Sequence, residues 1–371
     1  MTTPAASPIQ RTSRDPAVLQ ARLQDWLART LGSDANPIVG TLSGTDANGM
    51  SSDTVLFDAS WTDADGTSRD EQLVARIAPD ANDVPVFPSY DMPGQFETIR
   101  LVHELTDVAV PEPRWCEPET TSIGAPFFVM NRVDGAVPPD VLPYPFGNNW
   151  LFDATTEQQQ RLQDSTVQAI AALHAISDAT SRFAFLERPA PGATHLRRHV
   201  AHTRAWYDMV KAGGAGSPLV ERGFGWLDAH WPAEEGPTVL SWGDARIGNV
   251  IYADFTPAAL LDWEMAGLGP RELDVAWLVC GHLVFQDLAS SLGLPGMPDF
   301  LRADDVTARY EELTGHAPRD FAFYLTYAAL QWGVVFLRTG QRQAHFGERE
   351  MPADAEELIY CRSLIERMLA D

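Results

Sequence analysis

The chain has 371 residues, and its content of 45% hydrophobic and 21% charged residues excludes a disordered or fibrous protein. Its 51 acidic residues against 27 basic ones give a formal net charge of −24, which argues against nucleic acid or an anionic membrane surface as a partner. The acidic balance favours a cationic ligand, although a general role in solubility explains it more simply.

The composition also limits the sites that the chain can build. Cys116, Cys280 and Cys361 lie far apart without a CxxC pair, so we expect buried thiols and neither a zinc site nor a disulfide framework. Lys211 is the only lysine, so a role that elsewhere requires lysine must fall to arginine. Residues 1–14 have no apolar run and are predicted to be a disordered lead-in and not a signal peptide, which makes a cytoplasmic location the default expectation.

The first predicted elements are a helix and a sheet. Asp15 is a typical N-cap, Pro16 suits the first helical position and Gly32 is a typical stop. Leucines at four-residue spacing form the apolar face of this helix: Leu19, Leu23, Leu27 and Leu31. Residues 38–77 contain short β-type runs separated by turn residues, which predicts an antiparallel sheet.

The remaining chain divides into the end of this sheet and a mainly helical part. Residues 94–105 have a helical pattern, and residues 126–135 have that of a last strand, after which several prolines break the periodicity. We predict an N-terminal nucleotide-binding lobe over residues 15–131 and a C-terminal catalytic lobe over residues 132–371. Helical patterns follow at residues 157–176, 195–213, 274–288, 304–315 and 321–337, and from about Ala353.

The run at residues 321–337 is nearly apolar enough for a membrane span. It is shorter than the roughly 20 residues that a bilayer requires, and it contains Gln331 and Gly333. We therefore predict a buried helix.

The stretch WGDARIGN holds Asp244 and Asn249 in a short glycine-flanked loop, and Asp262 follows in LLDWE. The residues between them have the pattern of a β-hairpin around the four-residue turn 254–257. In that register Asn249 lies directly opposite Asp262, with side chains about 4.5 to 5.5 Å apart. An amide oxygen and a carboxylate at this separation can bind one ion.

This pair predicts a magnesium site. Two protein oxygens make a poor calcium cage, whereas Mg²⁺ usually takes one or two carboxylates together with substrate phosphates. A site of this kind implies a nucleotide. Asp244, just ahead of the hairpin, would face the reacting end of the phosphate chain and accept a proton from an attacking hydroxyl.

Three ordered motifs carry a resemblance to a known family. They are a GD-x4-N loop, a D-[WF]-E strand end and a downstream Asp: here Gly243-Asp244 with Asn249, Asp262-Trp263-Glu264, and Asp274. The chain resembles the aminoglycoside phosphotransferase and choline kinase group, and WGDARIGNVIY is similar to the branch of that group associated with acyl-CoA dehydrogenases. The resemblance covers about residues 40 to 288. It implies a two-lobed, protein-kinase-like α+β fold with a small antiparallel-sheet lobe and a larger helical lobe.

The resemblance also implies roles for the residues of these motifs. Asp244 would be the catalytic residue, Asn249 and Asp262 would hold Mg²⁺, and ATP would be the phosphoryl donor. Asp274 would support the catalytic loop, and its place at the start of a helical pattern is also compatible with a helix N-cap.

Other side chains near the motifs have both a functional and a structural interpretation. Arg246 and Glu264 are candidates for contact with phosphate or substrate. His195, His199 and His202 share one helical face, but without an HExxH motif and with arginines beside them we predict a partly exposed face and no metal site.

In the small lobe, the resemblance requires a cation on a central strand, paired with an acid on the following helix. Arg76 occupies the strand position in place of lysine, and Glu97 is the candidate partner. Arginine can grip phosphate through a wider, bidentate fork, so phosphate alignment would differ from that of a lysine enzyme. A solvated strand residue is the alternative for Arg76.

Two further segments are expected to contact the nucleotide. Ser43, Gly44 and Gly49 lie in a loop that would cover the phosphates, although the loop lacks GxGxxG and is equally compatible with a plain hairpin loop. A strand end would bind the adenine edge through backbone groups, or would simply connect the lobes: Met130, Asn131, Arg132 and Val133.

The sequence thus predicts a Mg-ATP-dependent kinase that phosphorylates a hydroxyl group of a small molecule. An aminoglycoside-like cation and a hydroxyacyl compound are the candidate acceptors. A nucleotide-binding pseudokinase and a Mg-dependent phosphohydrolase are the alternatives. The sequence does not indicate an oligomeric state.

Overall fold

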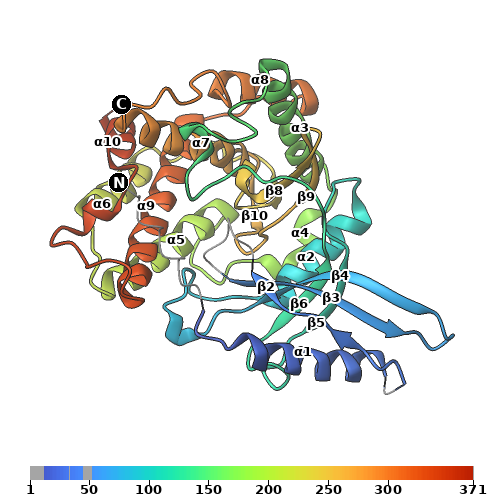
Figure 1. Ribbon diagram of the computed structural model, residues 1–371. Helices are drawn as coiled ribbons and strands as arrows, with labels where there is room; N and C mark the ends of the chain where they lie inside the picture. Colours follow the sequence, from blue (N-terminus) through green and yellow to red (C-terminus); the bar gives the residue numbers. More distant parts are fainter. Residues whose placement is uncertain (1–11, 33, 45–51, 371) are drawn as a thin grey trace.

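The computed structural model describes residues 12–32, 34–44 and 52–370, and it has the predicted two-lobed α+β architecture (Figure 1). A small lobe built on an antiparallel sheet lies against a larger, mainly helical lobe. Gly49 and most of the predicted lead-in lie outside the described residues. Within the described part of the chain, none of the helices combines the length and apolar character needed to cross a membrane.

The small lobe contains a six-stranded antiparallel sheet in the order β1-β3-β4-β6-β5, with β2 paired to β3. Its strands are β1 (Ile38–Val39), β2 (Ser43–Gly44), β3 (Asp53–Thr62), β4 (Ser68–Ile77), β5 (Pro113–Glu117) and β6 (Phe127–Asn131). β4 lies in the middle of the sheet, and its last five residues are all buried. This position explains why Arg76, near the end of β4, is only 7% exposed.

Two helices pack on this sheet. α1 (Pro16–Leu31) has the predicted N-cap, since the Asp15 carboxylate accepts hydrogen bonds from two N–H groups of the first turn. α2 (Met92–Leu105) begins two residues before the predicted start, because Asp91 accepts the N–H of Gly94 at 2.9 Å and caps the helix.

The large lobe consists mainly of helices. They are α3 (Thr156–His174), α4 (Ala179–Arg182), α5 (His195–Ala212), α6 (Pro218–Ala229), α7 (Glu272–Ser291), α8 (Ala303–Thr314), α9 (Phe321–His345) and α10 (Arg362–Ala370). The apolar run lies in α9 and is buried, as predicted. α10 begins nine residues later than predicted, because the Glu356 carboxylate accepts Ser217 Oγ–H at 2.8 Å and the Leu219 N–H at 2.6 Å and holds the preceding segment in a 3-10 turn.

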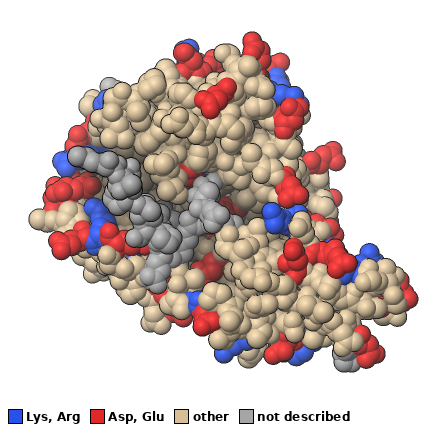
Figure 2. Space-filling view, viewed as in Figure 1, with Lys and Arg blue, Asp and Glu red and all other residues tan. Residues whose placement is uncertain are grey.

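Acidic side chains are distributed over the face shown in Figure 2 and do not form a single patch there. This distribution fits a general contribution of the −24 charge to solubility.

Two short sheets of the large lobe carry the predicted motifs. β7 (Thr238–Ser241) pairs with β10 (Gly267–Pro270), and β8 (Val250–Ala253) pairs with β9 (Thr256–Leu260). The hairpin turn between β8 and β9 has two residues, Asp254 and Phe255, both at positive φ (48° and 59°), as in a type I′ turn.

The predicted register of this hairpin is therefore wrong by one residue. The shorter turn moves the pairing by two residues, and a bulge between Ile251 and Tyr252 restores one of them. The carbonyl of Asn249 accepts the N–H of Leu261 at 2.8 Å, so Asn249 pairs with the neighbour of Asp262. Asp262 follows at once, in the left-handed region with φ 55°.

The segment at residues 83–86 fastens the small lobe to the large one. From α9, Arg342 donates to the Asp83 carbonyl and Arg338 Nε donates to the Pro85 carbonyl at 2.8 Å. From α5, Trp206 Nε1 donates to the Val86 carbonyl at 2.9 Å. These bonds join the lobes through a segment distant in sequence from the strand β6.

Candidate active site

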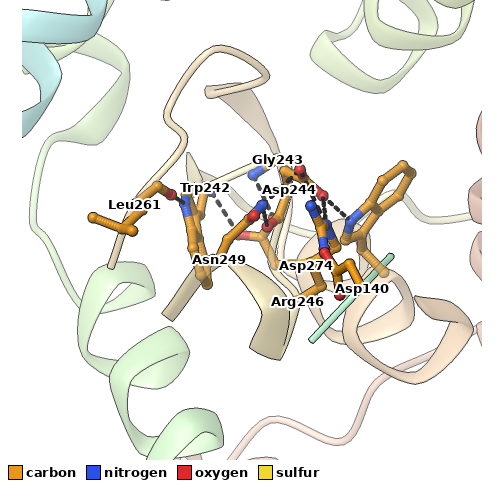
Figure 3. Close-up of polar contacts among 9 residues, drawn as sticks. Asp140, Trp242, Gly243, Asp244, Arg246, Asn249, Leu261 and Asp274 are labelled. Carbon is orange, nitrogen blue, oxygen red and sulfur yellow. Dashed lines mark hydrogen bonds and ion pairs between the residues drawn. The ribbon is translucent and has the colours of Figure 1, made fainter. Parts of the chain in front are cut away.

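The loop between β7 and β8 is held in place by one buried carboxylate (Figure 3). Asp274, from the first turn of α7, accepts the N–H of Trp242 at 2.7 Å, the N–H of Gly243 at 2.9 Å and Ser241 Oγ–H at 2.7 Å. Its carboxylate is fully buried, and His174 Nε2 lies 3.0 Å from it. These four partners fix the backbone immediately before Asp244.

Asp274 does not cap its own helix, because α7 begins at Glu272. Its carboxylate instead accepts hydrogen bonds from the loop after β7. His174 completes this support and bonds through Nδ1 to the hydroxyl of Tyr310 at 2.7 Å. The sequence predicts only a packed helix residue at His174, since nothing in its local pattern connects α3 with α7.

Gly243 is required by the loop geometry. Its φ is 87°, and a Cβ at this position would overlap the carbonyl of Met265. The loop before Asp244 is thereby packed directly on the segment that follows Asp262.

The carboxylate of Asp244 is held by three donors, two from its own loop and one from α7. Trp277 Nε1, from α7, donates to Oδ1 at 2.7 Å, and Asn249 Nδ2 donates to Oδ2 at 2.6 Å. Arg246 Nε donates to Oδ1 at 3.1 Å. With its rotamer fixed in this way, the carboxylate can orient a reacting group without a large loss of entropy. No sequence pattern predicts that Trp277 donates a hydrogen bond to Asp244.

The amide of Asn249 divides its two polar atoms between two tasks. Its Nδ2 holds Asp244, whereas its buried Oδ1 has no hydrogen-bond partner among the described residues. Asp262 lies at the same end of the hairpin, and its Oδ1 is 2.6 Å from Arg76 Nη2. An orphaned amide oxygen and a carboxylate at one end of a hairpin fit the oxygen ligands that Mg²⁺ prefers.

Arg246 is paired with two carboxylates and not with one. It binds Asp244 through Nε, and its Nη1 bonds with Asp140 from the segment after β6. Burial acts to lower the pKa of Arg246, but the charges of Asp140 and Asp244 outweigh it and raise that pKa above its ordinary value. Arg246 therefore stays cationic beside Asp244.

The expected pair of Arg76 and Glu97 is not formed. Arg76 Nη2 binds Asp262, while Glu97 faces away and binds Arg100 at 2.6 Å on the same helix. Two residues earlier on α2, the buried side chain of Gln95 lines the cavity that Arg76 also lines. The helix is present as predicted, but its rotation about its own axis places Gln95, not Glu97, on the wall of this cavity.

The cleft between the lobes holds a cavity of about 250 Å³. Arg76 and Asp262 line it, and so does the whole of the predicted strand end: Met130, Asn131, Arg132 and Val133. Ser43 and Gly44 lie elsewhere, in a separate cavity of about 190 Å³ beside Arg14. The structure thus brings most, but not all, of the predicted nucleotide-contacting residues together.

The three histidines of α5 do not form a metal site. His199 is buried, and its Nδ1 is 2.6 Å from the hydroxyl of Tyr327 on α9. In residues 12–32, 34–44 and 52–370, we find no cluster of three or more His, Cys, Asp or Glu that could hold a metal. The face is partly exposed as predicted, since His195 and His202 are partly buried, while His199 is buried because α5 packs against α9.

Comparison with known proteins identifies similar chains. Residues 47–313, more than half of this chain, match the model of the phosphotransferase enzyme family. Acyl-CoA dehydrogenase family member 10 of Mus musculus is 25% identical over 250 residues, covering 63% of this chain and 21% of that protein. Family member 11 of Homo sapiens is 26% identical over 170 residues, covering 45% and 20%. The chain spans about a fifth of the length of these relatives.

Solved structures share the fold. A candidate aminoglycoside phosphotransferase of Ralstonia eutropha aligns over 94% of this chain and 96% of its own, with a TM-score of 0.63 and 20% identity. Aminoglycoside phosphotransferase APH(4)-Ia, in ternary complex with AMP-PNP and hygromycin B, aligns over 93% and 98%, with a TM-score of 0.53 and 15% identity. A choline/ethanolamine kinase family protein of Mesorhizobium loti has a TM-score of 0.53 and 14% identity over 95% and 97%. These neighbours confirm the predicted kinase-like fold.

Proposed function

Because the chain belongs to the phosphotransferase enzyme family, we propose that it transfers the γ-phosphoryl group of ATP, bound with Mg²⁺, to a hydroxyl group of a small molecule. One observation carries this proposal. The Asp244 carboxylate is fixed by three donors, and one of them, Asn249, presents a buried oxygen without a partner among the described residues. A nucleotide as donor is supported by the AMP-PNP complex of the structural neighbour.

The transfer requires an acceptor hydroxyl beside Asp244. The hydroxyl oxygen forms a bond to the γ-phosphorus while the bond from that phosphorus to the β,γ-bridging oxygen breaks. The proton of the hydroxyl passes to the Asp244 carboxylate, and ADP leaves. Since the transition state is loose, Asp244 contributes mainly by orienting the hydroxyl.

The remaining residues of the site would bind the phosphates. Asn249 Oδ1 and Asp262 would hold Mg²⁺, which when bound supplies positive charge that neutralises the phosphate oxygens. Arg76 would bind the phosphates from the sheet side of the cleft, and Met130–Val133 would bind the base through backbone groups.

The proposal is tested with the purified full chain and a screen of hydroxylated metabolites and aminoglycosides. Mass spectrometry detects phosphorylated products, and ADP formation is followed with and without Mg²⁺. We expect Mg-dependent phosphorylation that falls by about 10² to 10⁴ in Asp244→Ala. Asp228→Ala, on the exposed face of α6, is the matched control and is expected to keep the wild-type rate.

Two results would contradict the proposal. Nucleotide binding with equal background turnover in wild type and Asp244→Ala would identify a nucleotide-binding pseudokinase. Release of inorganic phosphate with no phosphorylated acceptor would identify a phosphohydrolase.

A further inference from the structure

A second cavity, of about 290 Å³, lies beside the nucleotide cleft. Gln95 and Trp263 line both cavities, so the two share a wall. The rest of its wall comes mainly from the large lobe and includes Arg188, His199, His202, Glu264 and Gln331. Its size suits a small molecule or part of one.

In the part of the chain that the structure describes, no carboxylate balances the charge of Arg188. Its Nη2 donates to the carbonyl of Met265 at 2.8 Å and lies 3.4 Å from His199 Nε2. Its Nε is buried without a hydrogen-bond partner among the described residues. Burial lowers the pKa of Arg188, and no carboxylate acts against that effect. Because a guanidinium keeps its proton in proteins, Arg188 remains a partly buried cation without a counter-ion among the described residues.

The acids in the wall of this cavity are bound elsewhere. Asp91 caps α2, Glu187 pairs with Arg198, and Glu264 pairs with Arg76 at 3.7 Å. None of these contacts involves Arg188. Arg188 is thus the cation of this wall that pairs with no carboxylate among the described residues.

The two histidines of the wall do not add to this charge near neutral pH. Burial, followed by the charge of Arg188, lowers the pKa of His202 to about 4. The same causes, with His202, lower the pKa of His199 well below its ordinary range. A neutral imidazole has one donor and one acceptor nitrogen, and His199 uses both, with Tyr327 and Arg188. His202 is therefore the imidazole that can donate to an anion paired with Arg188.

Arg188 is also close to the catalytic loop. The carbonyl of Met265 that accepts its Nη2–H packs against Gly243, the residue before Asp244. A molecule bound to Arg188 therefore lies next to the segment that carries the catalytic carboxylate.

We propose that this cavity is the acceptor pocket and that the acceptor is a small hydroxy compound whose anionic group, a carboxylate or a phosphate ester, pairs with Arg188. The inference rests on the proposed function and names its substrate class. An aminoglycoside-like polycation would place like charge against Arg188, which the pocket disfavours although the whole protein attracts cations. A hydroxy acid pairs its anionic group with Arg188 and leaves its hydroxyl for Asp244.

Binding is measured by titration calorimetry on the full chain without nucleotide, so the result does not depend on turnover. The probes are 4-hydroxybutyrate, 4-hydroxybutyl phosphate, the neutral 4-hydroxybutyramide and the cationic 4-aminobutan-1-ol. We expect both anionic probes to bind wild type at least about tenfold more tightly than the amide. Arg188→Gln should remove this preference, and Arg188→Lys should keep part of it.

Arg182→Gln is the matched control, because Arg182 is exposed and lies outside this cavity. Equal binding of the carboxylate and its amide to wild type, or tighter binding of the amino alcohol, would overturn the inference even if Arg188→Gln failed to fold. An anion preference that survives in a folded Arg188→Gln would overturn it as well. Phosphorylation of cationic acceptors alone would overturn this inference and would still support the kinase function. Anion binding that depends on Arg188 but gives no phosphorylated product would overturn both the kinase function and the acceptor role of this cavity.

Discussion

Arg76 Nη2 lies 2.6 Å from Asp262 Oδ1, so the cation predicted to bind phosphate is paired with the carboxylate predicted to bind the metal. Its Nη1 is held by Thr54 Oγ1 at 2.8 Å on the neighbouring strand. The guanidinium thus bridges the sheet of the small lobe and the end of the β8–β9 hairpin. A ligand in the cleft meets both groups at once.

Substitution of Arg76 should weaken nucleotide binding. We expect Arg76→Gln to raise the Kd for Mg-ATP about tenfold or more, because it removes the guanidinium fork and leaves Asp262 without its counter-ion. Arg76→Lys keeps the charge but not the fork and should lie between the two. Titration calorimetry with a non-hydrolysable ATP analogue measures the effect.

Arg69→Gln is the control for this series, since Arg69 lies on the same strand in an exposed pair with Asp63. Unchanged nucleotide affinity in Arg76→Gln would show that the cation acts only on the fold.

Removal of one donor to Asp244 should slow the transfer. Trp277→Phe deletes the Nε1–H that binds Asp244 Oδ1 and keeps a ring against Trp332, whose centroid is 5.7 Å from that of Trp277. We expect kcat to fall about tenfold with little change in the KM for ATP, because a hydrogen bond to a charged group is lost at the reacting end. Steady-state kinetics with the identified acceptor measure this split.

Trp226→Phe, at a stacked surface pair with His230, is the control for that experiment. A change confined to the KM for ATP would place Trp277 outside the chemical step.

Asp274 should be essential for stability. The carboxylate of Asp274 accepts hydrogen bonds from Ser241, Trp242 and Gly243. In Asp274→Asn, the NH₂ group of the new amide would face some of these donors and could not accept their hydrogen bonds. We expect the free energy of unfolding to fall by about 3 kcal/mol. Urea unfolding measures this loss. Asp287→Asn on the same helix, where the partly buried Asp287 pairs with the exposed Arg367, should cost less than about 1 kcal/mol. Equal losses in both variants would contradict the role of Asp274.

Stability should fall on mild acidification. Burial lowers the pKa of His282 to about 4, and burial with Arg188 lowers that of His202 to about 4. The unfolded chain, with a histidine pKa near 6.5, then binds more protons than the folded one between about pH 4 and 6.5. The contribution of both groups is complete above pH 6.5 and is lost as the pH falls toward 4.

Thermal unfolding at pH 7.5 and pH 5.5 tests this expectation, and the midpoint should drop at the lower pH. His202→Gln should lessen the drop. A midpoint that rises on acidification would refute the sign of the shift.

The fold could be predicted because its signals are local. The Asp15 cap and the leucine spacing define α1, and the apolar run 321–337 defines the core of α9. The order of Asp244, Asn249 and Asp262 predicted the family that the match over residues 47–313 shows. Each of the three residues lies next to a short strand. The lobe boundary and the cytoplasmic location stay predictions.

What could not be predicted depends on contacts between distant segments. The hairpin register was wrong because Asp254 and Phe255 adopt a type I′ turn without the glycine that usually marks it. Glu97 was placed beside Arg76 because the rotation of α2 is set by packing on the sheet. No local sequence pattern marked Arg188 as a binding residue. The feature that matters, the lack of an acidic partner among the described residues, is visible only in the folded structure.

The guanidinium on β4 also determines how the cleft responds to chemical probes. An amine at that position would react with an acyl phosphate of a nucleotide, whereas a guanidinium is permanently protonated and does not act as a nucleophile. The one lysine, Lys211, is engaged with Glu221 on the far helices of the large lobe. Lysine-directed nucleotide labels should therefore leave this cleft unmarked, and profiling by that chemistry would overlook the protein.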